Sequence, residues 1–189
     1  MPRPLRTGED GDVFHVTTRG NRQGLVFMDD ADRILLAAFL KRTIPRYGWI
    51  CHAFAFLGNH FHLLIETPTF NLSAGMQYVC GRYGQSFNQR HGHIGHVFQG
   101  RFKSKHVMSD EHFLECSRYI ELNAVRAGLV RRPDAWPWSS YRATAGLGRR
   151  PAFLTVDTVL ELFDADVRRA RAAYRRFVAD GLRADMAGV

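Results

Sequence analysis

Cysteine is scarce in this sequence: there are three in 189 residues, and Cys51, Cys80 and Cys116 are far apart. An odd number without close pairs excludes a disulfide framework and a zinc knuckle, and it favours a reducing, cytoplasmic setting. No apolar run reaches the roughly 18 residues that a membrane-spanning helix needs, and no apolar segment follows the basic N-terminus. We therefore expect neither membrane insertion nor secretion.

Acidic residues are also in short supply. Asp and Glu total 18 against 26 Lys and Arg, which gives a net charge of +8. A basic balance favours a polyanionic partner, nucleic acid or an acidic membrane surface. The hydrophobic share of 46% argues against disorder, and a chain of this length can bury a core as a single domain.

The hydrophobic pattern predicts seven elements in the order β-α-β-β-α-β-α. The strands are expected at 13–18, 49–57, 60–67 and 102–108, and the helices at 29–47, 72–90 and 111–123. The first six have the order of a ferredoxin-like split βαβ unit, an α+β fold whose mostly antiparallel sheet carries its helices on one face. We further expect Asp29 or Asp30 to cap the first helix, Asp110 to cap the third, and Ile34, Leu35, Ala38 and Phe39 to form the first helix's apolar stripe.

The composition of the sequence changes after Gly128. A connecting segment rich in Pro and Trp follows, and Arg149 to Pro151 mark a second boundary. We interpret residues 1–148 as the functional domain. Residues 149–189 are expected to form a helical appendage of the same domain, with two helices between 156 and 181.

The sharpest chemical signal is His60-Phe-His62. Side chains alternate along a strand, so both imidazoles project from one face while Phe61, Leu63 and Ile65 share the other. Two neighbouring imidazoles can bind one metal ion. The alternative is an ordinary pair of surface histidines, and we place the metal site ahead of it.

A second signal lies in the helix predicted at 111–123. Phe113, Cys116, Ile120 and Ala124 form an apolar stripe, and Tyr119 falls outside it. Its neighbours at helical spacing are His112, Glu115, Asn123 and Arg126. Because Asn123 follows Tyr119 by one turn, the Tyr119 hydroxyl and the Asn123 amide oxygen can reach the same site. The alternative is an amphipathic tyrosine that only packs its ring.

Basic side chains accompany both signals. Arg101, Lys103 and Lys105 alternate along one predicted strand, with Phe98 and Phe102 interleaved. The predicted DNA-binding set is Arg19, Arg22, Arg101, Lys103, Lys105, Arg118 and Arg126. Basic and aromatic residues together are typical of surfaces that bind single-stranded nucleic acid.

Five sequence blocks extend these signals: His15-Val-Thr-Thr-Arg-Gly-Asn21, Asn59-His-Phe-His62, Phe98-Gln-Gly-Arg-Phe-Lys-Ser104, Tyr119 to Val130, and Trp136-Pro-Trp-Ser-Ser-Tyr141. With them the chain resembles the single-tyrosine HUH transposases, and most closely the REP-associated tyrosine transposases of bacteria, from about residue 14 to 141. Leu57-Gly58, Glu121 and Ala124 differ from the residues common in that family.

The resemblance implies a metal-dependent transposase that cleaves single-stranded DNA beside palindromic hairpins. It implies that His60, His62 and Asn123 bind a divalent metal, Mg²⁺ or Mn²⁺, and that Tyr119 is the nucleophile that forms a 5′-phosphotyrosine. Glu115 and His112 are candidates for the base. The implied location is the bacterial cytoplasm, associated with the nucleoid, and the chain is either a monomer or a homodimer.

Two other functions fit parts of the sequence. A ferredoxin-like sheet also serves as a non-catalytic nucleic-acid-binding module, so the fold alone does not identify an enzyme. A metal-dependent hydrolase could use water, with Tyr119 in a structural role. A covalent protein–DNA adduct would separate the transposase from both.

Overall fold

The computed structural model describes residues 7–187 and contains the seven expected elements in the expected order, with ends within a few residues of the predicted ones. They are β1 (Asp12–Arg19), α1 (Asp30–Tyr47), β2 (Ile50–Phe56), β3 (His60–Thr67), α2 (Leu72–His91), β4 (Lys103–Val107) and α3 (Asp110–Arg126). Two 3-10 turns, η1 (Asn21–Gln23) and η2 (Pro133–Ala135), and three further helices, α4 (Tyr141–Thr144), α5 (Asp157–Glu161) and α6 (Val167–Ala187), complete the order.

The four strands form one antiparallel sheet in the order β2-β3-β1-β4. This is the expected split βαβ arrangement, so the α+β fold class is confirmed. Phe61 of β3 packs against Phe27 and Phe98 on the side covered by α1 and α2. Its neighbour His62 points to the other side, where it meets Tyr119 of α3.

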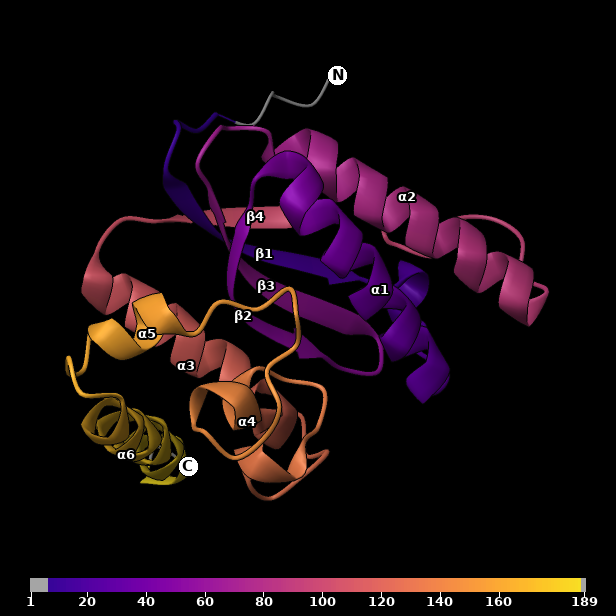
Figure 1. The fold of residues 1–189 in the computed structure, drawn as a ribbon. Helices are drawn as coiled ribbons and strands as arrows, with labels where there is room; N and C mark the ends of the chain where they lie inside the picture. The colour runs from indigo at the N-terminus through magenta and orange to yellow at the C-terminus, as the bar shows by residue number, and fades with distance from the viewer. Residues whose placement is uncertain (1–6, 188–189) are drawn as a thin grey trace.

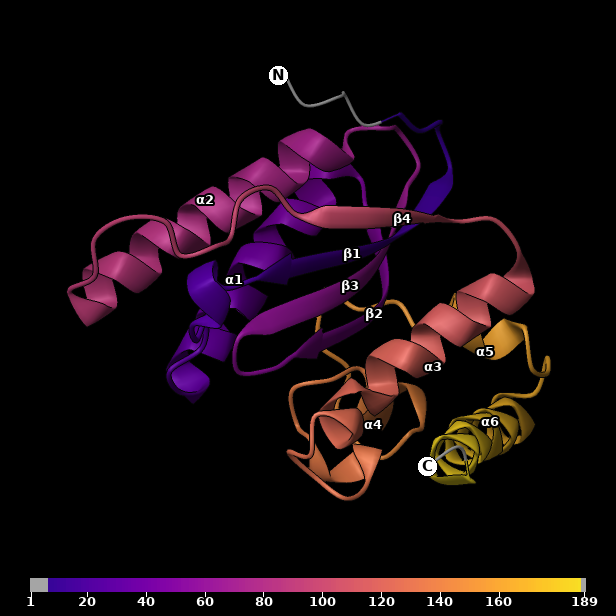
Figure 2. The same cartoon turned by 180° about the vertical axis from the view of Figure 1, so that it is seen from behind.

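The second face of the sheet is therefore not left bare. Helix α3 lies across it, mainly over β2 and β3, while the β1–β4 side remains less covered (Figures 1 and 2). The predicted apolar stripe of α3 is confirmed, because Phe113, Cys116, Ile120 and Ala124 are all buried. Its cap differs from the prediction: Ser109, not Asp110, accepts the hydrogen bond from the His112 amide, at 3.2 Å.

The predicted stripe of α1 is only partly right: Leu35 and Phe39 pack against the core, but Ile34 and Ala38 do not. Ile34 is 60% exposed, whereas Leu36, Leu40 and Ile44, spaced by four residues, face the core. Apolar residues occur on several sides of this helix, so periodicity alone did not identify the buried side. Its start was predicted correctly, since Asp29 is the N-cap and accepts from the Asp32 amide.

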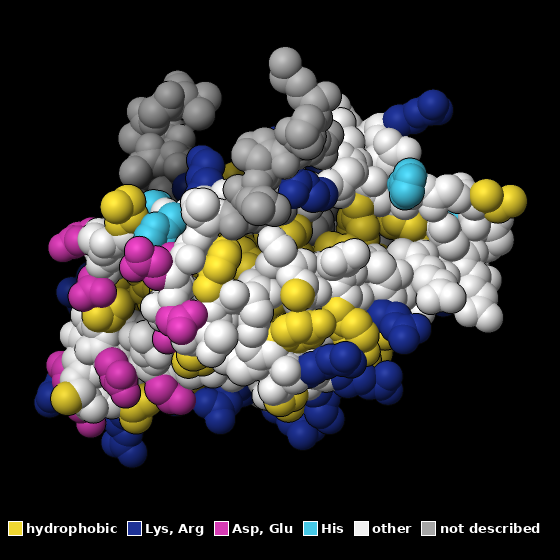
Figure 3. All heavy atoms as spheres, turned by 90° about the horizontal axis from the view of Figure 1, so that it is seen from above, with side chains coloured by type: hydrophobic (Ala, Val, Ile, Leu, Met, Phe, Trp, Pro, Cys, Tyr) yellow, Lys and Arg dark blue, Asp and Glu magenta, His cyan; other side chains and the backbone are white. Residues whose placement is uncertain are grey.

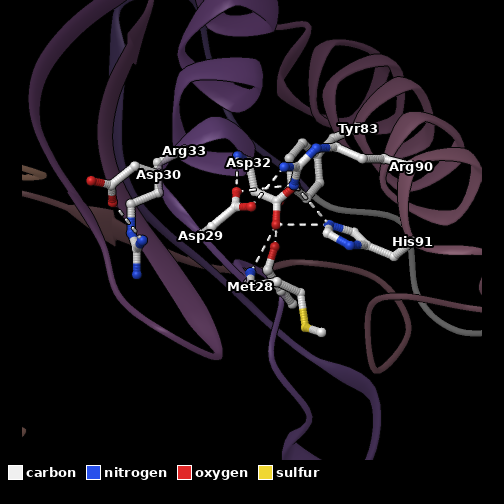
Figure 4. Close-up of polar contacts among 9 residues, drawn as sticks. Met28, Asp29, Asp30, Asp32, Arg33, Tyr83, Arg90 and His91 are labelled. Carbon is white, nitrogen blue, oxygen red and sulfur yellow. Dashed lines mark hydrogen bonds and ion pairs between the residues drawn. The ribbon is translucent and has the colours of Figure 1, made fainter.

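A buried carboxylate ties the beginning of α1 to the end of α2 (Figure 4). Asp32 is fully buried, accepts from the Met28 amide at 2.8 Å, and pairs with Arg90 at 2.7 Å and with His91 at 3.0 Å. Burial by itself would raise the pKa of Asp32, but the hydrogen bonds from His91, Met28 and Arg90 outweigh it, and the pKa lies below its ordinary value.

The C-terminal segment is continuous with the core. Ala170, Tyr174 and Val178 of α6 are fully buried in the same hydrophobic cluster as the sheet residues. Helix α6 packs on α3, and the guanidinium of Arg118 lies 4.3 Å from the centre of the Phe177 ring. The predicted pair of helices is present, and within residues 7–187 no helix is long and apolar enough to cross a membrane.

Candidate active site

Strand β3 places the two histidines as the alternation predicts. His60 and His62 lie on the α3 side of the sheet, with ring centres 5.0 Å apart. The turn that precedes them is fixed by backbone hydrogen bonds, since the amides of Val26 and Phe27 both donate to the Gly58 carbonyl. The pair therefore begins the strand from an anchored position.

One ring nitrogen of His62 is engaged within the sheet. Its Nδ1 lies 2.9 Å from Nε2 of His15 and 3.1 Å from the hydroxyl of Thr17, both on β1. Its Nε2 is buried and has no hydrogen-bond partner among the described residues. Burial, followed by the neighbouring His15 and His60, lowers the pKa of His62 to about 2, so the ring is neutral and one nitrogen keeps a free electron pair.

The turn residue Asn59 orients His60. The Asn59 side-chain amide donates to the Gln23 carbonyl at 3.2 Å, which directs its Oδ1 at Nδ1 of His60, 2.7 Å away. A neutral imidazole that donates through Nδ1 has an unprotonated Nε2. That atom lies 3.3 Å from Oδ1 of Asn123, so two electron-pair donors face each other.

Tyr119 lies beside these donors, on the same helix as Asn123. Its ring centre is 5.7 Å from the ring centres of both His15 and His62, and the Arg126 guanidinium lies over the Tyr119 ring, 5.0 Å from its centre. The side chain is 43% exposed, and within residues 7–187 its hydroxyl forms no hydrogen bond. The phenol is thus fixed by ring contacts while its oxygen stays accessible.

The residues present fit a divalent cation. Nε2 of His60, the buried Nε2 of His62 and Oδ1 of Asn123 are electron-pair donors without a proton between them, an arrangement that a cation stabilises. Within the described part of the chain, no three His, Cys, Asp or Glu side chains form a possible metal site. A metal here therefore depends on the Asn123 amide oxygen.

The predicted basic residues lie around this centre to different extents. Two adjoining hollows of about 530 and 920 Å³ run between β4 and α3, and both are lined by His62, Tyr119, Lys103 and Lys105. Lys103 and Lys105 are exposed and pair across the sheet with Thr17 and His15. Arg19 and Arg101 line the larger hollow, Arg118 and Arg126 the smaller one.

Two members of the basic set stand apart. Arg22 is exposed in η1 with a φ of 52° and lines neither hollow. Arg118 bonds Glu115 at 2.6 Å, donates to the Phe177 carbonyl and stacks on that ring. Its guanidinium is thus already engaged in joining α3 to α6.

Both candidate bases line the smaller hollow. Glu115 is paired with Arg118, and Nδ1 of His112 accepts from the Met108 amide at 3.4 Å. Neither is hydrogen-bonded to Tyr119 in the described part of the structure.

Sequence reasoning missed the residues that orient the histidines, His15, Thr17 and Asn59. The signal for His15 and Thr17 was the alternation of β1, which places both on the His62 side once the strand register is known. It identified Glu121 as a departure from the family but did not predict that this residue is buried on α3, where its carboxylate accepts from Ser140 at 2.7 Å. Burial raises the pKa of Glu121 to about 8.

Comparisons with known proteins address the family and the fold of this chain. The family model described as "Transposase IS200 like" matches residues 13–123, which include β1, both histidines, Tyr119 and Asn123. A solved REP-associated tyrosine transposase bound to a REP hairpin is similar, with a TM-score of 0.65, 18% identity and coverage of 82% of this chain and 92% of that chain.

A Deinococcus radiodurans structure described as a transposase also matches, with a TM-score of 0.45, 16% identity and coverage of 64% of this chain and 96% of that one. A search of curated proteins gives no match.

Proposed function

The chain belongs to the IS200-like transposase family, and on that premise we propose that it cleaves and rejoins single-stranded DNA with Tyr119 as the nucleophile. The observation that carries the proposal is the convergence of Tyr119, His60, His62 and Asn123 from β3 and α3 on one place. An accessible phenol oxygen beside nitrogen and oxygen atoms that offer lone pairs suits covalent phosphoryl transfer.

We propose that His60, His62 and Asn123 hold a divalent cation, Mg²⁺ or Mn²⁺. Mixed nitrogen and oxygen ligation is compatible with either ion, and imidazoles favour Mn²⁺ in vitro. When bound, such an ion polarises the scissile phosphoryl group. His15 and Asn59 keep the two imidazoles in the tautomers that leave Nε2 unprotonated.

The Tyr119 oxygen attacks phosphorus and displaces the 3′-oxygen of the preceding nucleotide. The products are a 5′-phosphotyrosine and a free 3′-hydroxyl. The phenol proton passes to a base, for which Glu115 and His112 are the candidates within the smaller hollow, and the departing 3′-oxygen takes up a proton from water. Because one phosphodiester is exchanged for another, a 3′-hydroxyl can reverse the reaction, and strand transfer requires no ATP.

We propose a hairpin-bearing single strand as the substrate, cut beside the hairpin. The similar solved structure is described as bound to a REP hairpin. Lys103 and Lys105 supply positive charge on the open side of the sheet, where an unpaired strand can lie along β4. The three free cysteines are compatible with action in the bacterial cytoplasm, on nucleoid DNA.

The test is cleavage of labelled, hairpin-bearing single-stranded DNA with Mn²⁺, analysed on a denaturing gel. Wild-type protein should give a cut strand and a covalent protein–DNA adduct. Tyr119→Phe removes only the attacking oxygen, so cleavage and adduct should both disappear while DNA binding persists. Tyr78→Phe on α2 is the matched control and should behave as wild type.

The outcomes separate the candidate functions. DNA binding without an adduct in the wild-type protein would leave the non-catalytic binding module. Cleavage at the wild-type rate by Tyr119→Phe would mean that water is the nucleophile and that the proposed mechanism is wrong.

A further inference from the structure

A separate pocket of about 750 Å³ lies on the α2 side of the sheet, between α2 and the segment that leads into β4. This size falls within the range of sites for small ligands, roughly 300–1,000 Å³. Figure 3 looks onto the molecule from above, where hydrophobic side chains gather beside Lys and Arg side chains. None of the proposed catalytic groups lines this pocket.

The α2 wall of the pocket has an unusual composition. Gln77, Gly81 and Gln85 are spaced by four residues and so share one side of the helix. A Cβ at Gly81 would meet no atom within 4 Å, so the glycine leaves a gap between the two glutamines. Neither glutamine makes a side-chain hydrogen bond within the described residues, so both amides offer a donor and an acceptor.

The opposite wall is aromatic and held in place. The Phe98 ring packs 6.1 Å from the centre of Phe61 and 6.0 Å from that of Tyr83. The segment before it is anchored by Asn88, whose amide donates to the Gly95 carbonyl at 2.8 Å. An aromatic ring and two open amides that line the same pocket match the two properties of a nucleobase, an apolar ring face and an edge of donors and acceptors.

The pocket adjoins the proposed cleavage site. Gly100, Arg101 and Phe102 line both this pocket and the 920 Å³ hollow that contains Tyr119 and His60. Since β4 is an edge strand, these residues lie where a DNA strand can pass from one side of the sheet to the other. The segment before β4 runs along α2 in Figure 2.

We propose that this pocket binds one unpaired nucleobase of the DNA strand whose phosphate lies at Tyr119, with Phe98 contacting the base face and Gln77 and Gln85 contacting its edge. The inference rests on the proposed function, because it takes the same single-stranded substrate. It adds a base-reading element to a site whose other predicted contacts are to phosphate, and it predicts sequence preference at one position near the cut.

The experiment measures DNA binding in chelator, so that it is independent of cleavage. Hairpin oligonucleotides carry an abasic site at each unpaired position in turn, and affinity is measured by fluorescence anisotropy. In the wild-type protein one abasic position should weaken binding about tenfold, as expected for the loss of one stacked base. Changing the base at that position should also change the affinity.

Gly81→Leu fills the gap between the glutamines without a steric clash at Cβ. It should bind all oligonucleotides with similar affinity, because it has lost the contribution of that one base. Gln77→Ala should reduce the discrimination between bases. Gln89→Leu is the matched control: it adds a leucine to an exposed position of the same helix outside the pocket and should keep the wild-type profile.

A Gly81→Leu profile identical to that of the wild type would overturn the proposal, as would a wild-type protein indifferent to every abasic position. A small molecule or a peptide would then be the occupant to seek. If the wild-type protein showed the expected abasic-site profile but did not cleave DNA, that result would count against the Tyr119 mechanism and not against the base pocket.

Discussion

Replacing His15 tests how the proposed metal site is organised, because His15 contacts the three proposed metal ligands only through His62. Its Nε2 lies 2.9 Å from Nδ1 of His62, and burial, followed by the charges of Lys105 and His112, lowers the pKa of His15 to about 4. His15 is therefore a neutral acceptor that holds the His62 proton on Nδ1. In His15→Ala only the Thr17 hydroxyl, 3.1 Å away, remains to do so.

The size of the effect follows from the lost hydrogen bond. A neutral hydrogen bond contributes about 0.5–1.5 kcal/mol net, and residues that orient metal ligands change affinity by about 10–100-fold. We expect His15→Ala to weaken Mn²⁺ binding about tenfold, which equals about 1.4 kcal/mol. His15→Gln can place an amide oxygen near the original Nε2 and should recover most of the affinity.

Two measurements check this prediction. Electron paramagnetic resonance counts free Mn²⁺ during a titration of the full chain. Long-range ¹H–¹⁵N spectra of the metal-free protein identify the His62 tautomer, which should be Nδ1-protonated in the wild type and mixed in His15→Ala. His106→Ala, a histidine of β4 paired with Asp12, is the control and should leave both unchanged. Unchanged affinity and an unchanged tautomer in His15→Ala would refute the reasoning.

Three further predictions concern charge and packing. Lys103→Gln combined with Lys105→Gln should weaken single-stranded DNA binding and lower the slope of log affinity against log salt by about 1.4, that is about 0.7 per phosphate contact, in a salt titration. Tyr174→Ala should destabilise the protein by about 3–5 kcal/mol in urea unfolding, because the ring is fully buried. Asp32→Asn should destabilise the protein at neutral pH. Because the folded pKa of Asp32 is depressed, the difference in unfolding free energy from the wild type should shrink as pH falls below about 4. A difference that stays constant with pH would contradict this prediction.

The sequence predicted the elements, and the faces on which the candidate site residues lie, because local patterns determine both. Alternation alone assigns His60 and His62 to one side of β3, and helical spacing separates Tyr119 from the stripe of α3. Both assignments match the structure.

What escaped prediction depends on contacts between elements distant in sequence. The bond from His15 to His62 requires the β1–β3 register, and α3 could be assigned to the second face only by its packing on β2 and β3. The engagement of Arg118 with Phe177 joins residues 59 apart in the sequence, and no local period indicates it. The pocket beside α2 arises from a glycine whose importance is visible only once the opposite wall is placed.

The joint placement of Tyr119 and Asn123 on one helix has a kinetic consequence for the proposed reaction. Helix α3 is held on its far side by α6, with Arg118 stacked on Phe177, so it moves only if buried core is exposed. A DNA end joined to Tyr119 cannot then be carried away from His60 and His62 by a swing of the helix. The 5′ end stays where it was cut, and the free 3′ end is the partner that must leave and be replaced. The exchange of DNA strands should accordingly limit the rate of turnover. Longer hairpin stems that slow this exchange should lower the turnover rate without changing the rate of the cleavage step.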